Sequence, residues 1–462
     1  MKITSDSLNP VLIKDYRQHF HSKLLPIVMT ILLGGQLLAI LITQLALDDN
    51  NNRPNDDTGL FLFHIILGIF CIAAWILCAL QPMQRFIQER ANPELDFTRM
   101  CSMTPRQIIS GKLSSSLLIV LYLVSLCLPF MVIAYFLKGI SILDIATVFA
   151  SVLAIGILMI QIAILVGSTG KKSLAFIFFF SSIYLTPIVI SIDVAIFSKG
   201  IGKIGFLDVI RVASAYLFVM VFLYVLNIAI LGTKYTNNIL PTRCFLIVCA
   251  ALATLEKALS YFLKKDFLIP HSTLSIEAIL CFIAAIIATI AAWERHDSGP
   301  RVLNEAPKKL IPRSLFFLIS SGSASGIALA WIIAIIPIIR YACETIGKVN
   351  ALPSGLSPVI FIINGSIFII AYAQFAIILS KFIPSKPPVL SWLISIVVLA
   401  IVPAVFAGIF DITDRSDLSK FILALTPFQE SPEIIIALIF AAVGAIPCAF
   451  IVAQKARDFL KQ

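Results

Sequence analysis

Four polar residues inside long apolar runs are the positions at which this chain could do chemistry within a membrane. Glu256 and Lys257 interrupt one run, and Gln161 and Asn227 lie in two others. An ionisable side chain in lipid is costly, so these residues are candidates for a translocation pathway. Adjacent helical residues point about 100° apart, so an interfacial pair near the outer end of a tilted helix explains Glu256 and Lys257 better. Hydrogen bonds across helices likewise explain Gln161 and Asn227 better than a pathway does.

The spacing of other reactive residues argues against catalysis in this chain. The glycines and lysine of the segment 167–173 suggest a phosphate loop, but Leu165 and Lys172 stand where GxxxxGK[ST] requires Gly and Ser or Thr. The five histidines form no Ser-His-Asp or HExxH pattern, and the nine cysteines include no CxxC pair. We therefore expect no enzymatic activity, metal site or cofactor here, and any ATP hydrolysis must come from another polypeptide.

A polar segment from Gln81 to Lys112 separates the second and third apolar runs and contains two helix starts. Asn92 is a suitable N-cap, followed by Pro and by acids that favour the positive end of a helix. Thr104 and Gln107 have the spacing of a capping box, which predicts a helix that continues into the next apolar run. A short helix between two spans suits docking of a cytoplasmic partner, and a basic loop without a partner is the alternative. The candidate partner-coupling residues are Glu89, Arg90, Glu94, Leu95, Asp96, Thr104, Pro105 and Arg106.

An amphipathic helix is predicted over residues 8–23, before the first apolar run. Asn9 can cap it, and Pro10 takes the first helical position. Apolar side chains recur every four residues, whereas the basic ones face elsewhere. Such a helix either lies in the membrane interface or packs on the cytoplasmic face of the protein itself. The residues concerned are Leu12, Tyr16, Arg17 and Phe20.

Composition places the chain among polytopic membrane proteins. Hydrophobic residues make up 59% of it, charged residues 13%, and the mean hydropathy is +0.99. A soluble domain is nearer half apolar and a quarter charged. The net charge of +10 does not indicate a nucleic-acid partner, because the basic residues are concentrated in the connections expected on the cytoplasmic side.

Apolar runs long enough to cross a bilayer predict an all-α protein with about twelve transmembrane helices and both termini in the cytoplasm. The layout suggests two six-helix halves, 1–235 and 236–462, each with its longest cytoplasmic loop after its second span (81–112 and 294–313). The expected location is the cell inner membrane. The predicted spans are about 24–47, 59–80, 113–137, 145–170, 173–197, 211–232, 243–262, 273–293, 314–340, 357–380, 389–410 and 433–453.

Two stretches resemble a known family, the ABC-2-type permeases, which are membrane-spanning subunits of ATP-binding-cassette transporters. Glu89-Arg90, Leu95-Asp96 and the stretch 103–113 are similar to that family's loop between its second and third spans, and 9–18 is similar to its NPxLxKELRQ opening. The chain departs from the family at 92–94, where Asn-Pro-Glu replaces a Gly-Thr pair. It departs again at 97–99, which the family usually keeps apolar.

The resemblance implies a permease that forms a translocation path for a small molecule, lipid or peptide, in a family that consists mostly of exporters. It also implies partner ATPase subunits that bind the loop 81–112, with membrane lipid around the spans. In the second half, 294–313 is either another docking loop or a passive counterpart. The rival interpretation is a twelve-helix secondary transporter driven by an ion gradient. The major facilitator type has only a short turn after its second span, so the long capped loop here favours the permease.

Overall fold

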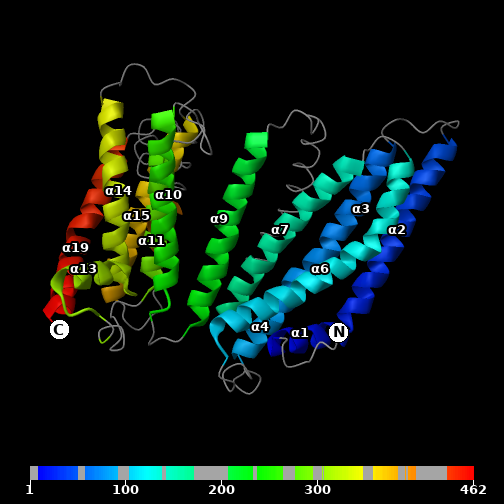
Figure 1. Ribbon diagram of the computed structural model, residues 1–462, viewed down its shortest axis with the longest axis horizontal. Helices are drawn as coiled ribbons and strands as arrows, with labels where there is room; N and C mark the ends of the chain where they lie inside the picture. The colour runs from blue at the N-terminus through cyan, green and yellow to red at the C-terminus, as the bar shows by residue number, and fades with distance from the viewer. Residues whose placement is uncertain are drawn as a thin grey trace, which may run out of the picture. The chain divides into compact units, whose positions relative to one another are not determined.

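The computed structural model describes residues 9–49, 58–91, 103–137, 142–170, 206–232, 237–263, 276–294, 304, 306–346, 357–382, 391, 394–401 and 434–461. Within these ranges the secondary structure is helical throughout (Figure 1). By its internal contacts the chain divides into a first unit, Met1–Gly232, and a second unit, Thr233–Gln462. This boundary lies close in sequence to the one predicted between the halves, at 235.

The described helices of the first unit are α1 (Pro10–Phe20), α2 (Leu24–Asp49), α3 (Thr58–Ala74), η2 (Trp75–Leu80), α4 (Gln81–Ala91), α6 (Pro105–Phe136), α7 (Ile142–Ser168) and α9 (Phe206–Leu231). The second unit contains α10 (Leu240–Leu263), α11 (Ile276–Trp293), α13 (Leu310–Ile319), α14 (Ser323–Ile346), α15 (Ser357–Phe382), η5 (Val397–Ile401) and α19 (Ile434–Lys461).

Seven of the described helices are long and apolar enough to cross a membrane, or eight if the bent pair α13–α14 is counted as one span. The helices α10 and α19, both predicted as spans, are not among these seven. The predicted span 173–197 and most of 389–410 lie outside the described residues. The described residues are thus all-helical, as predicted, and are consistent with a polytopic membrane protein, while the number twelve stays a prediction.

The outer surface of α2 has the character of a lipid-facing helix. Ile27, Ile31, Leu38, Leu41 and Leu45 recur along one face, and each is more than half exposed. A soluble protein rarely exposes so continuous an apolar stripe. In a bilayer the same stripe is surrounded by acyl chains, so its exposure is consistent with a membrane-embedded first unit.

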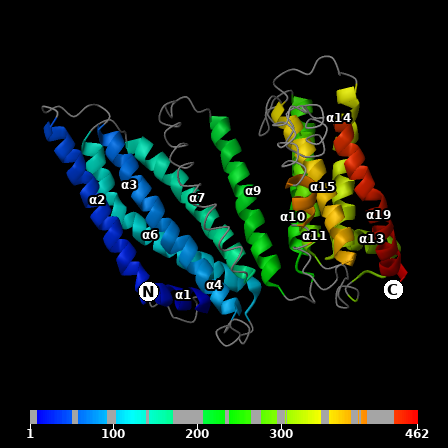
Figure 2. The ribbon, with the colours of Figure 1, turned by 180° about the vertical axis from the view of Figure 1, so that it is seen from behind.

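Figures 1 and 2 show α1 at the lower end of the first unit, at a steep angle to α2 and α3. The second membrane helix of this unit extends beyond the apolar core, because α3, η2 and α4 follow one another without a break from Thr58 to Ala91. The η2 segment is a π-helical turn, in which the Gln81 N–H donates to the Ile76 carbonyl five residues earlier. The sequence analysis did not predict this turn.

The predicted span 314–340 is wrong as a single helix. The chain bends by 95° between α13 and α14, at residues 320–322. Gly322 has φ of +150°, which side chains other than glycine rarely adopt. The Ile311-Pro312-Arg313-Ser314 stretch, at the end of the loop 294–313, lies inside α13.

A buried ion pair explains the bend. Arg243 of α10 is 1% exposed, and its guanidinium pairs with Glu294, just after α11, at 2.7 Å. Arg243 also donates to the carbonyls of Ser320 and Gly322, while the Gly322 N–H donates to Glu294. The broken helix ends are thus satisfied by side chains from two neighbouring helices. Hydropathy could not reveal the bend, because these partners lie far from it in sequence.

Candidate functional site

The short helix α1 is fixed across the start of α6. Asn9 caps it as predicted, accepting from the Val11 N–H at 3.0 Å, and the Asn9 amide also donates to the Gln107 carbonyl of α6. The two helices touch at Gly111, where an added Cβ would lie 2.8 Å from the Val11 Cβ. Only glycine allows this close approach, so Gly111 sets the position of α1 on α6.

Four charged side chains, which we call the Lys112 cluster, join α1, α4 and α6. Lys112 Nζ donates to Asp15 Oδ2 at 3.2 Å and to Glu89 Oε2 at 3.0 Å. The second oxygen of Glu89 accepts from Lys14 Nζ at 2.6 Å. The Lys112 side chain is only 4% exposed and also lies 4.5 Å from the centre of the Phe86 ring. Two lysines thus balance two carboxylates in a site largely withdrawn from water, where unpaired charge would be costly.

A second polar contact lies beside the cluster, between α1 and the start of α4. His19, which is 1% exposed, lies with Nδ1 3.0 Å from Gln81 Oε1. The Gln81 amide donates to Ser22 Oγ, which in turn donates to the His19 carbonyl. Burial and the nearby positive charge of Arg85 lower the pKa of His19 to about 4, so the ring is neutral at pH 7 and donates through Nδ1.

The end of α4 packs closely against the end of α7. At Gly167 an added Cβ would lie 3.0 Å from the Phe86 Cβ, and at Gly170 it would lie 3.3 Å from the Arg90 Cβ. Gly170 also has φ of +68° and ends the helix, as glycine commonly does. These packing roles account for the glycines in the stretch that mimics a phosphate loop.

The predicted capping box is present at the start of α6. The Gln107 N–H donates to Thr104 Oγ1 at 3.4 Å, and the Thr104 N–H donates to Gln107 Oε1 at 3.0 Å, with Pro105 next to the cap. Thr104 and Arg106 are exposed. This helix start is therefore accessible, yet it is fixed to α1 through Asn9 and Gly111.

The structure shows which side of α1 faces the protein, a point that the periodicity left open. Val11, Asp15 and His19 are buried against the protein, whereas Tyr16 and Phe20 are exposed. The rings of Tyr16 and Phe20 lie 4.6 Å apart, and Phe20 lies 6.0 Å from Tyr122 of α6. Leu12 is half-buried and Arg17 exposed. The helix therefore packs on the protein itself, the second of the two predicted positions, and leaves its aromatic side partly exposed.

The structure brings only part of the predicted coupling set together. Glu89 belongs to the Lys112 cluster, and the Arg90 guanidinium lies 5.9 Å from the centre of the Phe86 ring. Glu94, Leu95 and Asp96 lie outside the described residues. The described part of the site thus comprises the two ends of the loop, which are α4 up to Ala91 and α6 from Thr104.

The candidate pathway residues fall into two groups. The Asn227 amide of α9 donates to the Gln161 backbone carbonyl of α7 at 3.2 Å, and both residues are buried. This is the interhelical hydrogen bonding given above as the alternative. Glu256 is half-buried in α10, and the side chain of Lys257 lies outside the described parts.

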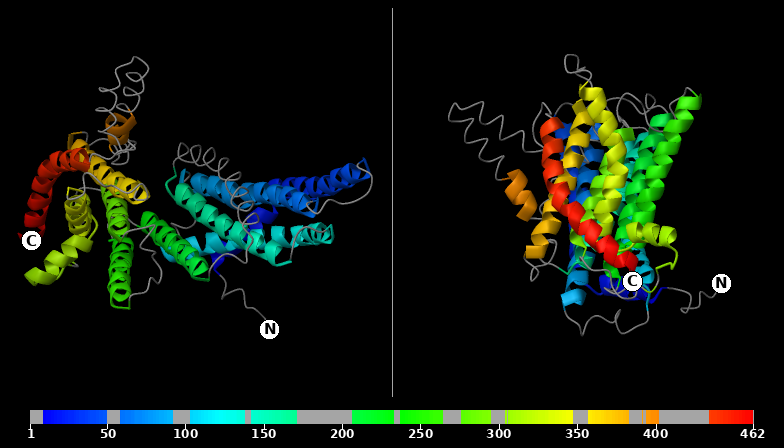
Figure 3. Two further views of the ribbon diagram at one scale, coloured as in Figure 1. Left: turned by 90° about the horizontal axis from the view of Figure 1, so that it is seen from above. Right: turned by 90° about the vertical axis from the view of Figure 1, so that its left-hand side faces the viewer.

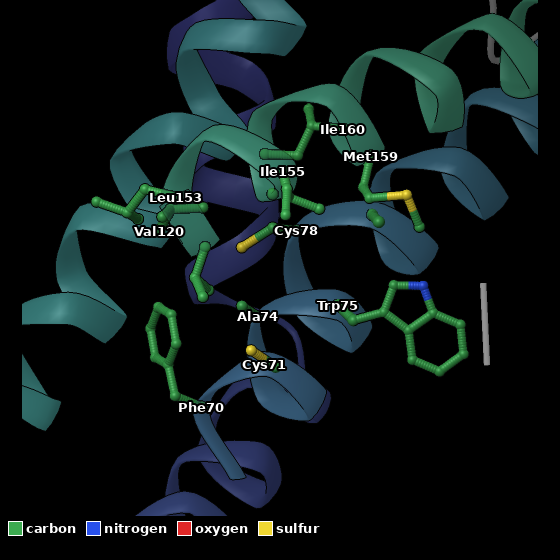
Figure 4. Close-up of a pocket in the computed structure, with 13 residues that line it drawn as sticks. Phe70, Cys71, Ala74, Trp75, Cys78, Val120, Leu153, Ile155, Met159 and Ile160 are labelled. Atoms are coloured by element: carbon green, nitrogen blue, oxygen red, sulfur yellow. The ribbon is translucent and has the colours of Figure 1, made fainter. Parts of the chain in front are cut away.

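A pocket of about 70 Å³ lies beside η2 in the first unit (Figure 4). Its lining is apolar and includes Phe70, Trp75, Cys78, Val120 and Met159. None of the four polar pathway candidates lines it. Its chemistry suits hydrocarbon rather than a charged ligand. Among the described residues, no group of three or more His, Cys, Asp or Glu side chains is arranged to hold a metal ion.

Comparisons of the chain with protein-family models, with curated proteins and with solved structures found no match. The ABC-2 resemblance therefore rests on the residues quoted above.

Sequence reasoning missed most of the polar residues of this site, namely Lys14, Asp15, His19, Gln81, Arg85 and Lys112. One signal could have found some of them. Val11, Asp15 and His19 recur at intervals of four and therefore lie on one face of the helix. This face combines an apolar side chain with two polar ones, so it could pack against the protein where polar partners are present.

Proposed function

We propose that this chain is the membrane-spanning permease subunit of an ABC-2-type transporter, which acts with a separate ATPase subunit and exports its substrate. The observation that carries the proposal is the Lys112 cluster. It joins the helix before the loop 92–102 to the helix after it, and joins both to α1. A partner that displaces this loop would act on three connected helices at once.

The charge distribution supports the same assignment. At the end of the first unit that bears the loop, the described basic residues include Lys14, Arg17, Arg85 and Arg106. By the positive-inside rule this end faces the cytoplasm, where an ATPase subunit would be found. Both termini would then be cytoplasmic, in the inner membrane of the cell. The aromatic side of α1 would lie among the lipid headgroups.

The test is purification of the tagged full-length chain in mild detergent, followed by mass spectrometry and an ATPase assay. We expect a stoichiometric partner with a phosphate loop, and ATP-dependent transport into vesicles that an ionophore does not abolish. Transport that collapses with the ion gradient and proceeds without ATP would instead establish the secondary transporter.

A further inference from the structure

The helix α13 has a geometry that a membrane span cannot have. It contains 10 residues and meets α14 at 95°. At 1.5 Å per residue it is about 15 Å long, roughly half the hydrocarbon thickness of a bilayer. Figure 3 shows it projecting sideways from the lower end of α14. If α14 crosses the membrane, α13 runs close to the membrane plane.

The direction of α13 is fixed by the protein rather than by lipid alone. Arg243 and Glu294 satisfy the backbone on both sides of the bend, as described above. At its inner face, Phe317 packs with Ala324 and with Phe459 of α19. Arg313 donates to the Phe459 carbonyl at 3.1 Å. The steep angle between α13 and α14 is therefore held by Arg243 and Glu294 at the bend and by the contacts of α13 with α19.

The side of α13 away from Phe317 is apolar and uncovered within the described structure, and so is the first residue of the helix. Leu310, Ile311 and Leu315 are 71%, 73% and 56% exposed. Lys308 and Lys309, also exposed, stand immediately before the helix. Three large aliphatic side chains beside two lysines match a bilayer surface, where acyl chains lie next to phosphates and anionic headgroups attract basic residues.

We propose that α13 is an in-plane membrane helix that binds anionic phospholipid. The side chains of Leu310, Ile311 and Leu315 insert among the acyl chains just below the headgroups. Lys308 and Lys309 bind the lipid phosphates. The occupant of this face is the bilayer itself, and the inference does not depend on whether the chain works with an ATPase.

The test uses full-length Ile311→Trp, reconstituted in phosphatidylcholine that carries bromine either near the headgroup or near the end of the acyl chain. The parent protein supplies the background from the four native tryptophans. We expect the added fluorescence to be quenched roughly twofold more by the shallow bromine. Absence of quenching by either lipid would place α13 in water or against a protein partner. Stronger quenching by the deep bromine would make it part of a span, and either result overturns the proposal.

The charge component is tested in the Ile311→Trp background with Lys308→Gln and Lys309→Gln. Addition of phosphatidylglycerol should increase shallow quenching in the chain that keeps both lysines, and the double substitution should abolish that increase. In pure phosphatidylcholine the two proteins should behave alike. If phosphatidylglycerol affects them equally, the lysines do not bind lipid. Leu315→Trp serves as a second probe should Ile311→Trp elute as an aggregate in size-exclusion chromatography.

Discussion

The carboxylate of Glu89 accepts a hydrogen bond from Lys112 Nζ at 3.0 Å, which joins the end of the second membrane helix of the first unit to the start of the third. The two residues are 23 positions apart in the sequence, and the loop 92–102 lies between them. The loop therefore begins and ends on two helices, α4 and α6, that this ion pair holds together.

Replacement of Lys112 by methionine should destabilise the protein. It keeps most of the side-chain volume but leaves Asp15 and Glu89 without their shared partner in a buried site. Removal of one partner from such a site costs about 3–5 kcal/mol. The midpoint of thermal unfolding in detergent should therefore fall markedly. Lys23→Met, at an exposed position near the end of α1, is the matched control. Equal midpoints for the two variants would contradict a structural role for the cluster.

Substitution of Gly111 by alanine tests the crossing of α1 and α6. The added Cβ would lie 2.8 Å from the Val11 Cβ and 3.1 Å from the Leu12 backbone nitrogen, so α1 must shift. Overpacking of this kind costs about 1–3 kcal/mol. The control is Gly34→Ala in α2, where an added Cβ meets nothing within 4 Å and alanine should slightly stabilise the helix. A thermal midpoint for Gly111→Ala at or above that of the parent would show that α1 is not seated at this position.

The buried histidine predicts a loss of stability in mild acid. The pKa of His19 is about 4 in the folded protein, against 6.5 for an unperturbed histidine, because burial and the charge of Arg85 disfavour the imidazolium. The unfolded chain thus takes up a proton first as the pH falls. The stabilisation is complete above pH 6.5 and declines towards pH 4, by up to about 3 kcal/mol.

The measurement is the thermal midpoint at several pH values for the parent and for His19→Gln. The parent should lose stability more steeply between pH 6.5 and 4, because the variant lacks the titrating ring. Comparison of the two slopes removes the contribution of the Glu89 carboxylate, which both proteins share. Parallel slopes would mean that the ring is not buried as described.

Loss of the capping box should affect coupling more than folding. Thr104→Ala removes an N-cap worth about 1 kcal/mol, which is too little to unfold the unit but enough to loosen the first turn of α6. Together with Arg106→Ala, it should leave expression near normal and weaken co-purification of the proposed ATPase partner. The comparison is Lys171→Ala with Lys172→Ala, after the fourth predicted span. If that pair abolishes association while Thr104→Ala does not, the docking loop has been assigned to the wrong segment.

Local features of this fold were predictable from sequence, and features made by distant side chains were not. Thr104 with Gln107, and Asn9 with Val11, satisfy helix ends within three residues, so their spacing alone indicates the caps. The Lys112–Asp15 pair joins residues 97 positions apart, and no local periodicity reports such a partner.

The same distinction explains the errors in the membrane helices. The apolar run 314–340 contains no proline or charge at residues 320–322 to mark a break. The bend there depends on Arg243, a residue of another helix. The periodicity of α1 likewise left its packed side open, and the pairing of Asp15 with Lys112, a residue of another helix, brings the side with Val11 and His19 inward.

The π-helical turn η2 sets the direction in which the side chains of the following helix, α4, point around the helix axis. Each residue of an α-helix advances the chain by about 100° around its axis. A single inserted residue in Trp75–Leu80 would therefore rotate α4 by roughly that angle, with no change in its composition or hydropathy. Glu89 would turn away from Lys112, and Phe86 would lose its contact with Gly167. A deletion of one residue within η2 should have the same kind of effect in the opposite sense, so the length of this turn, more than its side chains, keeps the Lys112 cluster in register.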